Sequence, residues 1–202
     1  MQARYYDPVI GRFYSNDPVD AVSHLSNEEG IRGFNRYSYA VNNPYKYTDP
    51  DGREIKVAKD LQKDYQQAKT YLTSKSSLAK AYFSRAERMD RTIRVERTSG
   101  GSESTVGDPV SGDSIEWNTS EGLVTNNGSQ SPATGLMHEI LHVLVNEDGV
   151  ANEAQDQMTI LKENAVSGQT GEGTRRDHND GIVQQVSGVT CRPSGDGGET
   201  CG

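Results

Sequence analysis

The stretch "TGLMHEILHVL", residues 134–144, places two histidines and a glutamate in one short apolar run. His138 and His142 are four residues apart, and Glu139 lies between them. On a helix, side chains at i and i+4 stand one turn apart, close enough for two imidazoles to share one zinc ion at about 2.0–2.1 Å. Glu139, about a third of a turn away, can reach a water on that ion without displacing it. We therefore expect Zn²⁺ here, with His138 and His142 as metal ligands and Glu139 as the catalytic base.

A helix must position these residues, and Ser131 followed by Pro132 marks its start. A serine side chain can cap free backbone N–H groups, and proline is tolerated in the first turn. The helix is predicted to end at about Asn146. The apolar residues that then share one side are Met137, Ile140, Leu141 and Leu144. That side is expected to face the core, and the other side carries the HExxH arrangement of zinc peptidases.

A third ligand is expected from a second helix, predicted at about 150–165 after an Asp-Gly turn. A short connection makes the two helices antiparallel neighbours. His142 lies about one turn before the connection, so residues one to two turns after it lie at the level of the metal. Glu153 and Asp156 both meet this condition. Glu163, about two turns further along, is expected to have a supporting or structural role.

The other elements are predicted from hydrophobic spacing and turn residues. Residues 55–91 show helical spacing interrupted at "SKSS", which indicates two packing helices. Segments 92–98 and 114–124 have strand patterns. We expect the second to be the edge strand along which a peptide substrate lies, although Trp117 within it can equally be a core residue. After Ala165 most of the chain is predicted to be loop, with one short strand at "GIVQQVSGV".

The composition limits the classes of protein to consider. A chain of 202 residues with 32% hydrophobic residues can form one globular domain plus an appendage. The net charge of −8, without a basic cluster, argues against nucleic acid as a partner. No apolar run has the length of a membrane span, and the first residues lack the layout of a signal peptide. Cys191 and Cys201 can close a short loop or remain free thiols.

Residues 1–52 differ in composition from the rest, with seven of the ten tyrosines and four of the seven prolines. "ARYYDPVIGRFYSNDP" and "NRYSYAVNNPYKYTDPDG" alternate aromatic residues with turn dipeptides, a pattern of short strands joined by tight turns. Both segments resemble the core-associated segment that ends the shell of RHS-repeat (YD-repeat) proteins. In that family the shell ends near "DPDG" and a variable C-terminal toxin follows. The resemblance implies an RHS segment at 1–52 and a toxin domain at 53–202.

A second resemblance covers about residues 110–180. "HEILHVL" resembles the zinc helix of clostridial neurotoxin light chains. It is still more similar to effector-type metallopeptidases of the NleD class, which also occur as RHS C-terminal toxins. "DQMT" resembles the ligand segment of these proteins, and the match implies that Asp156 is the third metal ligand, although glutamate is usual there. On geometry alone Glu153 remains the alternative.

In the same family a Glu-Asn pair and an Arg-x-x-Tyr motif follow. Here Glu163 and Asn164 form the pair, and Arg175 begins the second motif, which ends in His178 instead of tyrosine. The resemblance implies that Arg175 and His178 stabilise the oxyanion of the reaction, because positive charge and hydrogen-bond donors favour negative charge that develops in the transition state.

Together these observations predict an α+β, zincin-like metallopeptidase domain with an active-site helix, an antiparallel partner helix and a small mixed sheet, preceded by a β/turn-rich RHS segment. The expected activity is that of a zinc endopeptidase toxin with a protein substrate in a target cell, delivered by a specialised secretion system. The RHS shell and an immunity protein are the other expected partners. One alternative is a non-enzymatic RHS-derived cassette or surface fragment. Another is a metal-dependent nuclease using "RRDHNDG", against which the acidic charge counts.

Overall fold

The structure is a computed structural model of the chain, and the residues that it describes are 6–7, 12–13, 55–89, 91–107 and 112–202. Part of the RHS-like segment predicted at 1–52 falls within these residues. It forms a short antiparallel pair, with Tyr6 opposite Phe13. The remainder of that prediction lies outside the described residues.

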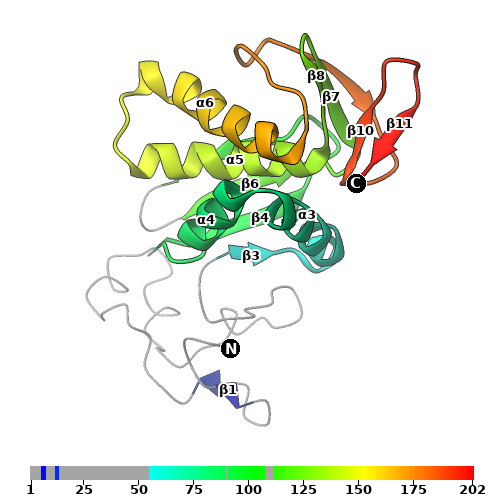
Figure 1. Cartoon of the computed structure of the whole chain (residues 1–202). Coiled ribbons are helices and arrows are strands. Elements are labelled where there is room, and N and C mark those ends of the chain that lie inside the picture. The colour runs from blue at the N-terminus through cyan, green and yellow to red at the C-terminus, as the bar shows by residue number, and fades with distance from the viewer. Residues whose placement is uncertain (1–5, 8–11, 14–54, 90, 108–111) are drawn as a thin grey trace.

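Helices and strands are mixed along the described part of the chain (Figure 1). The helices are α3 (Gln62–Lys75), α4 (Ser77–Ala86), α5 (Pro132–Glu147) and α6 (Asn152–Thr170), with a 3-10 turn, η2 (Lys59–Leu61), before α3. The strands are β1 (Tyr6–Asp7), β2 (Arg12–Phe13), β3 (Ile55–Val57), β4 (Ile93–Arg97), β5 (Glu103–Thr105), β6 (Asp113–Trp117), β7 (Glu121–Thr125), β8 (Gly128–Gln130), β9 (Ile182–Gln185), β10 (Cys191–Pro193) and β11 (Glu199–Cys201). The chain therefore belongs to the α+β class, as predicted. None of the helices described is long and apolar enough to cross a membrane.

The larger sheet has the strand order β3-β4-β6-β5, in which the first three strands are parallel and β5 is antiparallel to β6. Its strands bury alternate residues, as expected when one face packs on a core. The buried residues of β4 and β6 include Ile93, Val95, Ile115 and Trp117. These side chains belong to the same hydrophobic core as the apolar residues of α3, α4 and α5, which lie beside the sheet (Figure 1).

The prediction of one edge strand at 114–124 is wrong. The segment forms two strands in different sheets, and β6 lies between β4 and β5. Trp117 is fully buried, and its indole N–H donates to the carbonyl of Pro132 at 2.8 Å, so it is a core residue. Among the described strands of this sheet, β5 occupies the edge next to β6.

Helices α3 and α4 confirm most of the prediction for residues 55–91, except that the first residues form β3. Ser76 separates the two helices at the predicted "SKSS" break. Its backbone is extended, and its side chain accepts a hydrogen bond from the backbone N–H of Ala79 at 3.0 Å. An extended residue with a capping side chain stops one helix and starts the next.

Helices α5 and α6 pack closely against each other, one above the other in Figure 1. The predicted start of α5 is confirmed, because the hydroxyl of Ser131 accepts from the backbone N–H of Thr134 at 3.4 Å. α6 extends beyond its predicted end to Thr170. It ends there because Gly171 takes a left-handed conformation with φ of 76°, which glycine adopts without steric cost.

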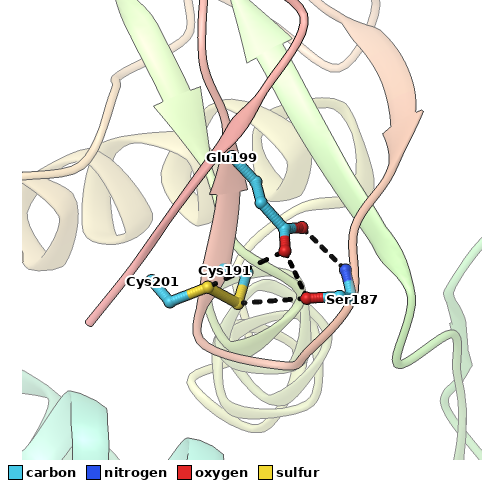
Figure 2. The surroundings of a disulfide bond; sticks show 4 residues. All are labelled: Ser187, Cys191, Glu199 and Cys201. Carbon is cyan, nitrogen blue, oxygen red and sulfur yellow. Dashed lines mark hydrogen bonds between the residues drawn. A yellow bond between two sulfur atoms is a disulfide. The ribbon is translucent and has the colours of Figure 1, made fainter.

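The chain ends in the β10-β11 hairpin, where Cys191 and Cys201 form a disulfide (Figure 2). Glu199 lies beside the disulfide and accepts from both the backbone N–H and the hydroxyl of Ser187. The turn before β10 also contacts α5, because the carbonyl of Val189 accepts from the N–H of Ala133 at 2.8 Å. The tail is therefore part of the folded domain.

Candidate metal centre

Three histidines from two segments meet at one point. His138 and His142 lie on α5, and His178 lies in the segment between α6 and β9. The ring centroids are 4.6 Å apart for His138 and His142, 4.8 Å for His138 and His178, and 5.0 Å for His142 and His178. One nitrogen of each ring lies within 4.8 Å of the others, so the three imidazoles can hold a metal ion.

The donor atoms fit a metal such as zinc. The Nε2 atoms of His138 and His142 are 3.0 Å apart. Two nitrogens bonded to one tetrahedral zinc ion at about 2.0–2.1 Å lie about 3.3 Å from each other. The Nε2 atom of His178 is buried and has no hydrogen-bond partner among the described residues. A buried nitrogen without a partner is costly, and a cation beside it removes that cost.

Helix α6 provides a partner for the Nδ1 atom of each of these histidines. The three partner residues on α6 are spaced three and four apart in the sequence, so they share one face of the helix. The pairs are Asp156 with His178 at 3.5 Å, Thr159 with His142 at 3.5 Å, and Glu163 with His138 at 2.5 Å. Partners at Nδ1 orient the rings and leave the Nε2 atoms available for a metal ion, which is the usual arrangement around metal-binding histidines.

The structure places His178, rather than Asp156, in the third position of the group. The side chain of Asp156 is 71% exposed and approaches Nδ1 of His178, on the side of the ring away from the Nε2 atom. Glu153 is exposed in the first turn of α6 and is not part of the group either. The helix predicted to donate a ligand instead supports the residues that form the group.

Glu163 is the most buried of these supporting residues, with an exposed fraction of 0%. Its carboxylate accepts from Nη2 of Arg175 at 2.8 Å, from the amide of Gln130 at 2.5 Å and from Nδ1 of His138. Burial by itself would raise the pKa of Glu163, but the hydrogen bond from His138 and the positive charge of Arg175 hold the pKa well below its usual range. Glu163 is therefore ionised at neutral pH and keeps the proton of His138 on Nδ1.

Arg175 is fixed in place by Asn164, the partner of Glu163 in the predicted Glu-Asn pair. The amide of Asn164 donates to the carbonyl of Arg175 at 2.7 Å and accepts from its N–H at 3.0 Å. The guanidinium points at Glu163 and lies beside Nδ1 of His138. It thus lies on the outer side of the His138 ring, whereas the oxyanion role predicted for Arg175 requires the side of the Nε2 atoms.

Glu139 follows His138 on α5 and is 6% exposed. Burial raises the pKa of its carboxyl to about 7, although a hydrogen bond with the side chain of Ser104 opposes this effect. Ser104 lies in β5, so Glu139 is directed toward the edge strand of the larger sheet. A carboxyl group with a pKa near 7 can both accept and return a proton at neutral pH.

The pKa values of the two helical histidines are lowered, and burial is the main cause at both. The pKa of His142 falls to about 4, with a further contribution from His138. Both imidazoles are therefore neutral at neutral pH, which is the form that binds metal ions.

The smaller sheet, with the order β8-β7-β9, holds the segment that carries Arg175 and His178. At one end, the N–H of Gly173 donates to the carbonyl of Ser129 in β8 at 2.8 Å. At the other end, Gly181 lies so close to β7 that a Cβ atom there would be 2.7 Å from the side chain of Leu123. The segment is anchored on both sides of His178, although it contains no long helix or strand.

A buried carboxylate also fixes the start of α5. Glu172, just after α6, accepts four hydrogen bonds of 2.8 Å each. The donors are the backbone N–H and hydroxyl of Ser131 and the hydroxyls of Thr134 and Tyr71. Negative charge is favourable at a helix N-terminus. Glu172 therefore links the start of α5 to α3 and to the start of the His178 segment.

Sequence reasoning identified the pair on α5 and the supporting position of Glu163, but it did not identify His178 as a member of the group or Thr159 and Gln130 as supporting residues. The residue type at position 178 offered one indication, because the imidazole of histidine is a common zinc ligand. No family model, curated protein or solved structure matches this chain. The function is therefore inferred from the site and from the resemblances in the sequence.

Proposed function

We propose that residues 53–202 form a zinc-dependent endopeptidase in which His138, His142 and His178 hold the ion. The observation that carries the proposal is the convergence of three imidazoles beside Glu139, a buried glutamate on the same helix. A zinc ion with three protein ligands keeps a fourth position for water, lowers the pKa of that water and polarises a carbonyl group.

Glu139 acts as the general base and then as the general acid. It accepts a proton from the attacking water and passes it to the amine that leaves when the peptide bond breaks. Its burial supports this role, because a carboxyl with a pKa of about 7 exchanges protons readily at neutral pH. Ser104 orients the carboxyl from the side of β5.

Glu163 and Arg175 act through His138. Glu163 fixes the tautomer of the ring, and Arg175 keeps Glu163 ionised within the core. This assignment replaces the oxyanion role predicted for Arg175, and His178 likewise becomes a ligand in place of an oxyanion donor. Both residues remain essential, but for holding the ion rather than for contacting the substrate.

The substrate is proposed to be an extended segment of a protein that lies along β5. This strand is at the edge of the larger sheet among the described strands, and its Ser104 contacts Glu139. A peptide that adds a strand there places its backbone next to the catalytic base. A zincin-like fold is proposed because α5 packs against both α6 and the larger, mixed sheet.

The biological setting is proposed from the sequence resemblances alone. The RHS-like segment at 1–52 and the similarity around "HEILH" suggest a toxin domain that is released from an RHS shell and delivered into a target cell by a specialised secretion system. Its substrate is then a protein of that cell, and an immunity protein protects the producer. A non-enzymatic cassette is less favoured, because it assigns no role to the buried Glu139 beside the three histidines.

The test compares the full chain with its Glu139→Gln variant. After incubation of each protein with a cell lysate, mass spectrometry of new protein N-termini is expected to show cleavage by the wild type and a loss of at least about 100-fold in the variant. Glu153→Gln, which changes an exposed glutamate outside the group, is the matched control and should cleave normally. Equal cleavage by wild type and Glu139→Gln, or none by the zinc-loaded wild type, would reject the peptidase.

A further inference from the structure

His178 differs from the other two histidines in how its position is set. His138 and His142 are held by the backbone of α5, whereas His178 lies in a short turn between α6 and β9. Within this turn the N–H of Asp180 donates to the carbonyl of Asp177 at 3.2 Å. A side chain in such a turn reaches a fixed point only if other contacts hold the turn itself.

Asp180 supplies those contacts. Its side chain is 4% exposed, although it lies in a surface turn. The carboxylate accepts from the backbone N–H of Arg176 at 2.8 Å and also bonds to the backbone of Asn126, which follows β7. Asp180 therefore closes the turn on both sides of His178 and ties it to the smaller sheet.

We propose that Asp180 is the positioning residue that keeps His178 in the metal centre. The inference rests on the proposed metal site, and it adds a residue that does not contact the ion. The guanidinium of Arg176 is 78% exposed and 3.6 Å from the carboxylate, so its charge contributes little. The backbone hydrogen bonds are what Asp180 provides.

Asp156 does not provide an equivalent restraint. It approaches the His178 ring at 3.5 Å, beyond the length of a good hydrogen bond, and its side chain is 71% exposed. Apart from the rings of His138 and His142, this weak contact is the one polar partner of the His178 ring among the described residues. Without Asp180, the metal itself would have to order the third ligand. The free energy of that ordering opposes binding, so zinc affinity would fall.

The experiment measures the zinc dissociation constant of the full chain by competition with a chromophoric chelator. Asp180→Ala is expected to weaken zinc binding by about 10–100-fold, as loss of outer-shell support does in metal sites. Asp180→Asn keeps one accepting oxygen and should lie between Asp180→Ala and the wild type. Asp196→Ala removes an aspartate that closes another exposed turn, in the C-terminal hairpin, and should bind zinc normally.

Two further readouts separate positioning from a general loss of structure. The visible spectrum of Co²⁺ bound to Asp180→Ala should shift toward that of His178→Ala, and the far-UV circular dichroism spectrum of the metal-free protein should stay unchanged. Most directly, Asp180→Ala should not weaken zinc binding further when it is introduced into His178→Ala, because Asp180 affects the metal site only by positioning the His178 ring.

Several results would overturn the inference. Zinc affinity of Asp180→Ala within twofold of the wild type, loss of the circular dichroism spectrum of the folded metal-free protein, or an equal further loss of zinc affinity when Asp180→Ala is added to His178→Ala would each do so. A wild type that binds no zinc would instead reject the proposed metal site, and His178→Ala with normal affinity would reject the third ligand. These outcomes are distinguishable because the single variants are measured side by side.

Discussion

At the scale of residues, the two nitrogens of each imidazole have different surroundings. The Nδ1 atoms face partners on α6, and the Nε2 atoms of His138 and His142 face each other at 3.0 Å. The sequence predicted two of the three ring positions because their spacing is local and helical. It did not predict the third, because His178 reaches the group through a turn whose course depends on distant contacts.

The two candidates for the third position can be separated by substitution. His178→Ala is expected to lower zinc affinity by several orders of magnitude, because it removes a donor atom. Asp156→Ala removes only an exposed contact and should retain one zinc ion per chain, with affinity reduced by less than about tenfold. Metal analysis after dialysis checks both variants, and the reverse order of effects would return Asp156 to the position of ligand.

Protonation of His142 should also affect the metal-free protein. Its pKa in the folded state is about 4, below the ordinary value of 6.5, so the unfolded chain takes up this proton first as the pH falls. The stability that His142 contributes is present above pH 6.5 and is lost toward pH 4. Urea unfolding with a chelator present, at pH 7 and pH 5, should show a smaller loss in His142→Gln than in the wild type.

The informative quantity is the difference in the pH dependence of stability between the wild type and His142→Gln, rather than the pH dependence of the wild type alone. Glu139 has a raised pKa of about 7, so it adds stability as the pH falls through the same range. That contribution is common to both proteins and cancels in the difference. Identical pH dependence in wild type and His142→Gln would contradict the buried, neutral state of this ring.

At the scale of elements, α5 carries two of the three grouped histidines and Glu139, and α6 and the smaller sheet contribute the residues around them. The helices were predictable because their apolar spacing and the Ser131 cap depend on residues that are close together in the sequence. Strands β5 and β8 were not predicted, since "EST" and "GSQ" have neither apolar alternation nor β-branched runs. They become strands because they form hydrogen bonds with β6 and β7, and this pairing cannot be read from their own residues.

The anchoring of the His178 segment can be tested at Gly181. Its φ of 139° is rarely adopted by other residues, and an added Cβ would lie 2.7 Å from Leu123. Gly181→Ala is therefore expected to destabilise the protein by about 1–3 kcal/mol and to weaken zinc binding. Chemical denaturation and chelator competition measure the two effects.

Gly168→Ala is the matched control for this substitution. Gly168 lies within α6, and a Cβ there meets nothing within 4 Å. Because alanine is a better helix former, the control should gain about 0.5–1 kcal/mol of stability with unchanged zinc affinity. If Gly181→Ala behaves like Gly168→Ala, the close contact between Gly181 and β7 does not restrain the segment.

At the scale of the whole molecule, the C-terminal tail and α5 are parts of one structure. The turn before β10 bonds to the first turn of α5, and Glu172 bonds to the same turn from the end of α6. The sequence left the state of Cys191 and Cys201 open, and the fold brings them together because they lie opposite each other on β10 and β11.

Reduction of this disulfide should destabilise the domain without removing the metal centre. Closing a short loop stabilises a protein by roughly 2–3 kcal/mol, mainly through the unfolded state. A dithiol reductant is expected to lower the urea midpoint of the wild type and to leave that of Cys201→Ser unchanged. A reductant that released zinc from the wild type would show that the tail controls the metal site directly.

The most direct test of the proposed metal centre is the zinc content of the full chain, measured beside that of His178→Ala. We expect one zinc ion per wild-type chain after dialysis against metal-free buffer, and loss of that ion in His178→Ala while the circular dichroism spectrum is retained. A folded wild type that binds no zinc when it is supplied, or a His178→Ala variant that keeps its zinc, would contradict a centre built from these three histidines.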